Sequence, residues 1–197
     1  YTKALAWSMH NTKEVMAASI YNNGFNASYT YGDGKRLFAT DHPLVNGGVN
    51  GNRPATYVDL SETTIENAVI QIGAWTDFRG LKIAIKPKQL IVPNELSFAA
   101  DKILNTVLKV DSTDNTINSI NHTGAIPQGY HVNHYLTDPD AWFITTDAPD
   151  GLKHYSRVAL SFDKDGDFDT GNLRWKARER YVFGVTNPLG CWGSEGI

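Results

Sequence analysis

The chain has 197 residues, of which 41% are hydrophobic and 20% charged, and its formal net charge is −3. This composition excludes a disordered protein, and the negative balance excludes a surface that is basic overall, although a local basic patch is possible. No apolar run is long enough to span a membrane, and a single cysteine, Cys191, excludes an internal disulfide and suits a reducing compartment.

The N-terminal segment predicts a helix over residues 3–22. Its apolar residues recur at helical intervals: Leu5, Met9, Met16 and Ile20. Gly24 follows, where a left-handed glycine can end a helix. Because Tyr1 is not an initiator Met, we expect this helix to be the end of a longer one and the gene product to extend upstream.

Residues 25–54 are dense in Gly, Asn, Asp and aromatic residues and predict a long ordered loop. Only residues 36–39 look like a strand, and the side chains expected to hold the loop are Phe25, Tyr29, Tyr31 and Phe38. A phosphate-binding P-loop does not fit, because Gly34-Lys35 is followed by Arg36 rather than Ser or Thr.

A second helix is predicted after Asp59 or Ser61, either of which can cap it, with Thr63 and Glu66 as an alternative capping box. It should end near residue 80. One face carries the apolar residues Ile65, Ala68, Val69, Ile72 and Trp75.

Residues 79–107 predict a strand, a turn, a second strand and an amphipathic helix. Apolar residues alternate with Lys and Ala over 81–86, Pro87 interrupts that strand, and residues 90–92 form a short buried one. A helix over 94–107 then carries Leu96, Ala99, Ala100, Ile103, Leu104 and Val107. The unit holds no nucleophile, acid–base pair or metal cluster, so its role is architectural.

The second half predicts a meander of strands. Residues 109–129 are polar and predict a flexible surface loop, and strands are expected at 131–136, 141–145 and 157–162. Residues 173–185 predict the longest strand. One face of it carries Trp175, Ala177, Tyr181, Phe183 and Val185, and the other carries Arg174, Lys176, Arg178 and Arg180, here called the basic stripe.

The basic stripe has three open interpretations: a contact with another subunit, a solvated strand face, or a contact with nucleic acid. The aromatic residues beside it point to the opposite face, which weakens an interpretation based on stacking with single-stranded bases. They should also pack on a core and so fix the basic side chains in place. We therefore regard Arg174, Lys176, Arg178 and Arg180 as candidate residues of a subunit interface.

Other candidate chemistry is weak. The aspartates Asp163, Asp165, Asp167 and Asp169 lack the glycine position and the final Glu of an EF-hand, so a solvated loop is favoured over a calcium site. His131 and His134 would lie on opposite faces of a strand, which argues against zinc. Cys191 has no neighbouring His in sequence. We therefore expect that the protein is not an enzyme and that it binds no cofactor and no metal.

Three stretches of the sequence carry a resemblance: residues 5–25, residues 33–52, and the unit 79–107 followed by residues 174–194. In these stretches the sequence resembles the major capsid (head) proteins of tailed bacteriophages. The resemblance is to the Hong Kong 97 type of fold, closest to Mu-like major head subunits. It implies an α+β protein with a peripheral domain at 1–54 and 152–197 and an inserted axial domain at 55–151, whose helices at 61–78 and 94–107 flank a small sheet. It also implies that an N-terminal arm, an extended loop and the start of the spine helix are missing.

The same resemblance implies a structural virion protein that is assembled in the host bacterial cytoplasm. Its partners would be other copies of itself, in the hexamers and pentamers of an icosahedral shell, and the packaged double-stranded DNA on the inner surface. The alternative is a nucleic-acid or protein binding module that uses residues 174–180. A hydrolase with a metal site in the aspartate loop is a third hypothesis.

Overall fold

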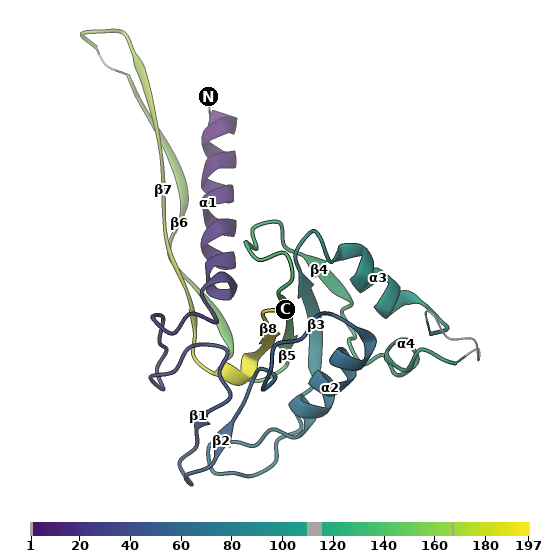
Figure 1. The fold of residues 1–197 in the computed structure, drawn as a ribbon. Helices are drawn as coiled ribbons and strands as arrows, with labels where there is room; N and C mark the ends of the chain where they lie inside the picture. The colour runs from purple at the N-terminus through teal and green to yellow at the C-terminus, as the bar shows by residue number, and fades with distance from the viewer. Residues whose placement is uncertain (1, 110–115, 167) are drawn as a thin grey trace.

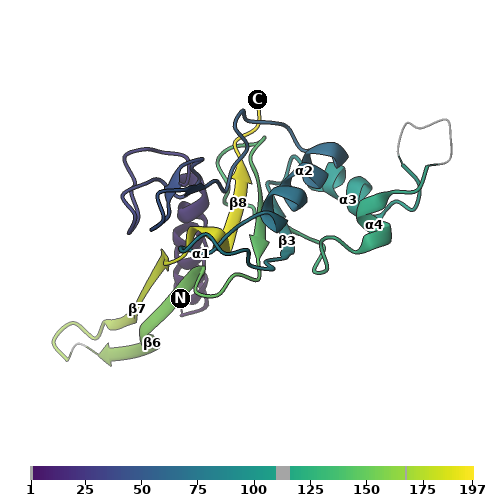
Figure 2. The ribbon, with the colours of Figure 1, turned by 90° about the horizontal axis from the view of Figure 1, so that it is seen from below.

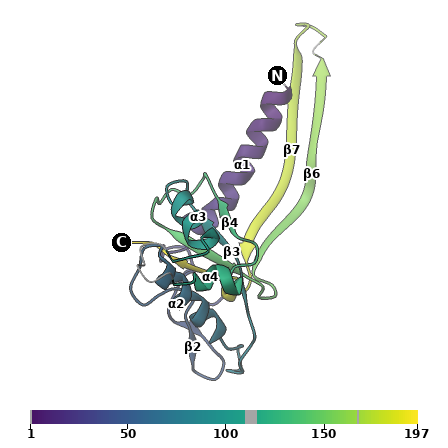
Figure 3. The ribbon, with the colours of Figure 1, turned by 90° about the vertical axis from the view of Figure 1, so that its right-hand side faces the viewer.

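The computed structural model describes residues 2–109, 116–166 and 168–197, which form a body and a long projection (Figure 1). The body contains a four-stranded sheet with helices. The projection consists of the first helix and a two-stranded hairpin that run beside each other (Figure 3). This mixed architecture agrees with the predicted α+β class.

Helix α1 spans Thr2–Asn22, which confirms the helix predicted over 3–22. Gly24 follows it, but its φ is not positive, so the predicted left-handed stop is wrong. The glycine is needed for space instead: a Cβ atom there would lie 2.5 Å from the Phe38 ring. Close packing of the loop on the helix end therefore requires this residue.

The loop over 25–54 is ordered by burial and by a small ladder. Strands β1 (His42–Pro43) and β2 (Val49–Asn50) pair antiparallel, and the strand predicted at 36–39 is wrong. Leu37, Phe38 and Ala39 are buried without a strand neighbour, and the rings of Phe25 and Phe38 lie 4.7 Å apart. Tyr29, expected to help hold the loop, is 53% exposed.

Helix α2 spans Glu62–Gly73 and is capped by Ser61, one of the two predicted caps. The predicted end near residue 80 is wrong, because the helix ends at Gly73 with Ala74 as its C-cap. The capping box pairs Ser61 with Thr64 rather than Thr63 with Glu66. Trp75 lies just beyond the helix, yet it is buried and its Nε1 donates to the Gly51 carbonyl at 2.8 Å. Trp75, just after α2, thereby holds the loop that precedes the helix against the body.

The strand predicted over 81–86 is wrong, and Pro87 begins a strand rather than interrupting one. Strand β3 spans Pro87–Val92, whereas the segment before it makes only the isolated bridge between Thr76 and Lys82. Leu81 is 64% exposed although Ile85 is buried. Alternation alone did not produce a strand here because no neighbouring strand pairs with the segment.

Helix α3 spans Ser97–Asn105, shorter than the predicted 94–107. The flexible loop predicted over 109–129 is wrong in part, because α4 (Ser119–Thr123) lies within it, is capped by Asn118 and ends at Gly124 with φ 60°. The stretch 110–115 of that prediction lies outside the described residues.

The sheet has the order β4-β3-β5-β8, built from β4 (Tyr130–Val132), β5 (Trp142–Thr146) and β8 (Cys191–Ser194) around β3. The β3–β4 pair is parallel and the other two pairs are antiparallel. The strands predicted at 131–136 and 141–145 are thus confirmed, the first with a much earlier end.

Both faces of this sheet are covered (Figure 2). The three later helices, α2 to α4, cover one face, where Leu90, Trp142 and Trp192 are buried. The end of α1 and the loop before β1 cover the other, around Phe143 and Cys191. Strand β8 comes from the C-terminal segment yet pairs with β5, and the division into 1–54 with 152–197 and 55–151 stays a prediction.

The hairpin consists of β6 (Leu152–Gly166) and β7 (Leu173–Val185). The bounds of β7 are those predicted, but β6 extends well beyond the predicted 157–162 and, at 15 residues against 13, is the longer strand. Register shifts between Ser156 and Ser161 mark irregular pairing in its middle. The turn η1 (Pro188–Gly190) then leads from the hairpin into β8.

Candidate functional site

The basic stripe lies on one exposed face of the hairpin, as its alternation predicted. Residues opposite each other in an antiparallel pair share a face, and the residues of β6 opposite the stripe are Asp165, Asp163, Ser161 and Val158, in the order Arg174 to Arg180. Lys176 pairs with Asp163 at 3.5 Å. Arg178 and Arg180 instead face Ser161 and Val158, and neither forms an ion pair with a described residue.

The opposite face of β7 is covered by α1 only in its middle. Lys13 donates from Nζ to the Glu179 carboxylate at 2.7 Å and also lies 5.2 Å from the centre of the Tyr181 ring. Trp175 and Phe162, nearer the tip, remain 40% and 42% exposed. The expectation that a core under the aromatic face fixes the whole basic stripe is therefore wrong: one helix supports the centre of the hairpin.

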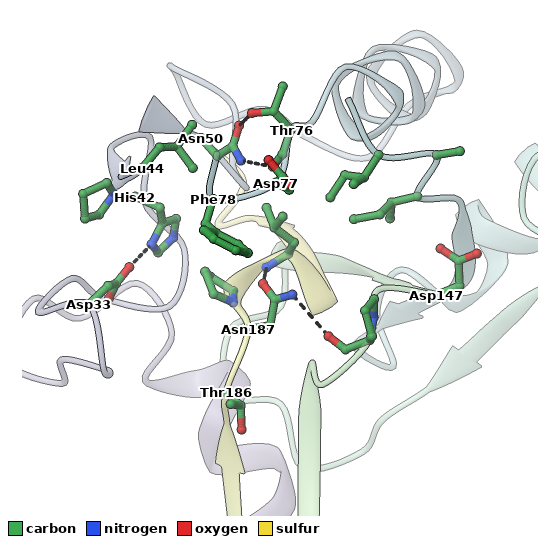
Figure 4. Close-up of a pocket in the computed structure, with 17 residues that line it drawn as sticks. Asp33, His42, Leu44, Asn50, Thr76, Asp77, Phe78, Asp147, Thr186 and Asn187 are labelled. Atoms are coloured by element: carbon green, nitrogen blue, oxygen red, sulfur yellow. Dashed lines mark hydrogen bonds and ion pairs between the residues drawn. The ribbon is translucent and has the colours of Figure 1, made fainter. Parts of the chain in front are cut away.

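A cavity of about 610 Å³ lies at the base of the hairpin, where the chain enters β6 and leaves β7 (Figure 4). Its acidic lining residues are Asp33, Asp77 and Asp147, and apolar walls come from residues such as Ile83, Ile85 and Leu189. No Lys or Arg in the described part of the chain lines it. The cavity is thus a partly apolar space whose lining contains carboxylates and His42.

Backbone groups hold two of these carboxylates in place. Asp77 accepts through Oδ1 from the amides of Arg79 and Leu81 at 2.8 and 2.9 Å, and Asp147 accepts through Oδ1 from the Lys86 amide at 2.7 Å. For the Oδ2 atoms of Asp77 and Asp147, the described part of the chain provides no hydrogen bond or ion pair. These two oxygens are available to a partner.

Asp33 has an internal partner instead. Its Oδ2 lies 2.5 Å from Nδ1 of the buried His42, whose Nε2 faces the Leu37 carbonyl and the Asn52 side-chain oxygen, both at 3.1 Å. Asn52 is fully buried and also donates to the carbonyls of Leu37, Pro188 and Cys191. This network joins the early loop to the turn before β8, so it is structural.

The sequence did not predict the cavity. Its lining comes from the loop before β2, the segment after α2 and both ends of the hairpin, which are distant in sequence. The only available signal was the density of Asp, Asn and Gly in the early loop, which equally suits a surface turn.

The remaining candidates show no sign of catalysis. Cys191 is fully buried, and burial raises the pKa of its thiol to about 12. Within residues 2–109, 116–166 and 168–197, no group of three or more His, Cys, Asp or Glu side chains is placed to hold a metal, and Asp167 lies outside those ranges. No helix in the described part of the chain has the length and apolarity to cross a membrane.

A comparison with known protein families identifies the family of this chain. The model of a phage capsid protein family matches residues 1–193. The chain belongs to the phage capsid protein family. It is therefore a structural viral protein of a bacteriophage capsid, as the resemblance implied.

Several solved structures are similar to this chain at low sequence identity. A chain of Mycobacterium phage Che8 matches 98% of this capsid protein and 61% of its own length, with a TM-score of 0.52 and 14% identity. A phage-related protein from Bordetella bronchiseptica RB50 matches 98% and 62%, with a TM-score of 0.54 and 10% identity. A virus-like particle from Pyrococcus furiosus matches 71% and 55%, with a TM-score of 0.45 and 14% identity.

This capsid protein spans between 55% and 62% of the lengths of those three chains. The likeness concerns the fold alone. No curated protein matches the sequence.

Proposed function

We propose that this capsid protein assembles with copies of itself into an icosahedral head shell that encloses double-stranded DNA. The observation that carries the proposal is the projecting hairpin, whose long strands have exposed apolar and basic side chains and few contacts with the body. Long uncovered strands are a liability for an isolated subunit, whereas a neighbouring subunit can cover them. Membership in the phage capsid protein family points the same way.

Within that family, the proposed architecture is the Hong Kong 97 type, of the Mu-like kind. Helix α1 would be the spine helix, residues 1–54 and 152–197 the peripheral domain, and residues 55–151 the axial domain, with β8 completing its sheet. The order of elements supports this: a long helix, a loop, a small sheet with helices and then a long hairpin beside the first helix. The role is architectural, without catalysis or cofactor, and assembly takes place in the bacterial cytoplasm.

The basic stripe is proposed as a subunit contact. Its exposure on the face of the hairpin that α1 leaves uncovered supports this assignment, and Arg178 and Arg180 are its strongest members because no described carboxylate compensates them. The second candidate is a contact with the phosphates of packaged DNA, which the same charges would also suit.

Electron microscopy of the purified protein tests the proposal. We expect rings, sheets or closed particles, and the Arg178→Glu, Arg180→Glu variant should remain folded but form no particles, because repeated like charges across an interface cost several kcal/mol. The matched control reverses two exposed lysines of the body, Lys88→Glu and Lys102→Glu, and should still assemble. Dispersed monomers from the unaltered protein, or normal particles from the arginine variant, contradict the proposal.

A further inference from the structure

We propose that the cavity at the base of the hairpin binds Arg178 and Arg180 of a second copy of this chain. The inference rests on the proposed self-assembly and names the surface that receives the basic stripe. It thereby specifies a head-to-tail contact in which the hairpin of one copy meets the hairpin base of the next.

Charge is the first argument. Among the described residues, three aspartates and no Lys or Arg line the cavity, and one of the three, Asp33, is paired with His42. The Oδ1 atoms of Asp77 and Asp147 are held by backbone amides, so these carboxylates are fixed, and their Oδ2 atoms have no partner among the described residues. Guanidinium groups pair with carboxylates in short charge-assisted hydrogen bonds. The neighbouring cation Arg79 is not part of the lining, and its guanidinium carbon lies over the Phe78 ring, 5.2 Å from the ring centre.

Apolar surface is the second argument. On the face of the hairpin that bears the basic stripe, Tyr155 and Val182 lie opposite each other and are 59% and 58% exposed. The cavity walls are also largely apolar, and Phe78 at the cavity is 59% exposed. A contact between these surfaces would bury apolar area around the arginines and lower the effective dielectric in which the ion pairs form.

Distance explains why the donor must come from another copy. Arg180 lies six residues before Thr186, which lines the cavity, and the intervening strand spans about 20 Å at ~3.3 Å per residue. An arginine side chain does not reach that far. Because donor and acceptor surfaces differ, the contact is heterologous, and repeating it produces a closed ring when the rotation between copies closes.

The first test removes the charge of the cavity without removing its hydrogen-bond acceptors. In the Asp77→Asn, Asp147→Asn variant the Oδ1 atoms can still accept from the backbone, so we expect an unchanged melting temperature and a particle yield lower by about tenfold or more, the loss of one charge pair being worth over 1.4 kcal/mol. Asp59→Asn, Asp101→Asn is the matched control outside the cavity. Wild-type particle yield from the cavity variant overturns the inference.

The second test mixes two assembly-defective variants and measures their mass by sedimentation velocity. The arginine variant Arg178→Glu, Arg180→Glu keeps an intact cavity, and the cavity variant keeps intact arginines. Each alone should be mainly monomeric, whereas an equimolar mixture should form a one-to-one dimer that cannot grow. A mixture that contains only monomers overturns the inference.

These outcomes separate the inference from the proposed function. If the cavity variant forms particles in the same yield as the unaltered protein, only the cavity contact is wrong and self-assembly stands. If the cavity variant assembles normally while the arginine variant loses affinity for double-stranded DNA, the arginines belong to a DNA contact and the inference is overturned. If the unaltered protein forms no particles, self-assembly itself fails.

Discussion

At the residue scale, Asn52 connects parts of the chain that are far apart in sequence. Its side chain donates to three carbonyls, from Leu37, Pro188 and Cys191 at 2.8, 3.0 and 3.2 Å, and accepts from the Ala39 amide at 2.9 Å. A fully buried amide with this many partners leaves several unsatisfied backbone groups when it is removed. Asn52 therefore holds the early loop on the sheet.

We expect Asn52→Ala to lower the free energy of unfolding by about 2 to 4 kcal/mol, because a buried polar group without a partner costs roughly 1 to 3 kcal/mol. Urea denaturation measures the change. Asn26→Ala, which alters an exposed asparagine of the same loop, should change the free energy by no more than about 0.5 kcal/mol. Similar effects of the two substitutions would refute the assigned role.

Cys191 should report on unfolding. Burial raises the pKa of its thiol from 9.0 to about 12, so the folded protein should not react with a thiol reagent at pH 8, whereas protein in urea should react fully. Because the unfolded thiol ionises first, this group makes the protein less stable as pH rises from about 9 to 12. Burial also raises the pKa of the Tyr21 hydroxyl, so this group likewise lowers stability at high pH. Rapid labelling of the folded protein at pH 8 would contradict this.

At the element scale, the ion pair between Lys13 and Glu179, here called the clamp, holds the hairpin on α1. Glu179, whose side chain is 6% exposed, accepts the hydrogen bond from Lys13 of α1. Lys13→Met should leave a nearly buried carboxylate without its partner and destabilise the hairpin by about 2 kcal/mol. Amide hydrogen exchange should then accelerate over residues 173–185 while β3 and β5 keep their protection.

The control for this clamp is Lys176→Met, which removes an exposed ion pair with Asp163 on the same hairpin. Exposed pairs contribute about 0 to 1 kcal/mol, so hairpin exchange should hardly change. If both substitutions accelerate exchange equally, α1 does not support the hairpin through Lys13.

Elements were predictable where their causes are local. The cap at Ser61 and the helical spacing after it predicted the start of α2 but not its end at Gly73, and strict alternation predicted the bounds of β7 and the basic stripe on it. The alternation over 81–86 failed because a strand also requires a neighbour to pair with, and none lies there. The cavity was not predictable because its lining residues, which are distant in sequence, come together only through the tertiary fold.

At the scale of the whole molecule, the C-terminal segment completes the core. Strand β8 is buried along its length, Trp192 packs against Trp142 at 4.9 Å, and Ser194 bonds to both backbone groups of Val58. The segment thus joins the sheet to the chain before α2.

Removing residues 189–197 should abolish cooperative thermal unfolding, because it leaves one edge of β5 unpaired and deletes buried Trp192. Deleting only Ile197, which is 86% exposed, should change the melting temperature little. Near-ultraviolet circular dichroism and calorimetry measure both. A cooperative transition in the longer truncation would show that the sheet is stable without β8.

The position of β8 also orders events during translation. The arginines of β7 leave the ribosome first, but the cavity proposed to receive them includes residues 186–189 and depends on a body that is closed only by residue 194. Domains fold as they emerge, so neighbouring nascent chains on one messenger RNA would carry donors without finished acceptors. Each copy would therefore become able to capture a neighbour only after residue 194 has left the ribosome, which keeps crowded polysomes free of premature assemblies.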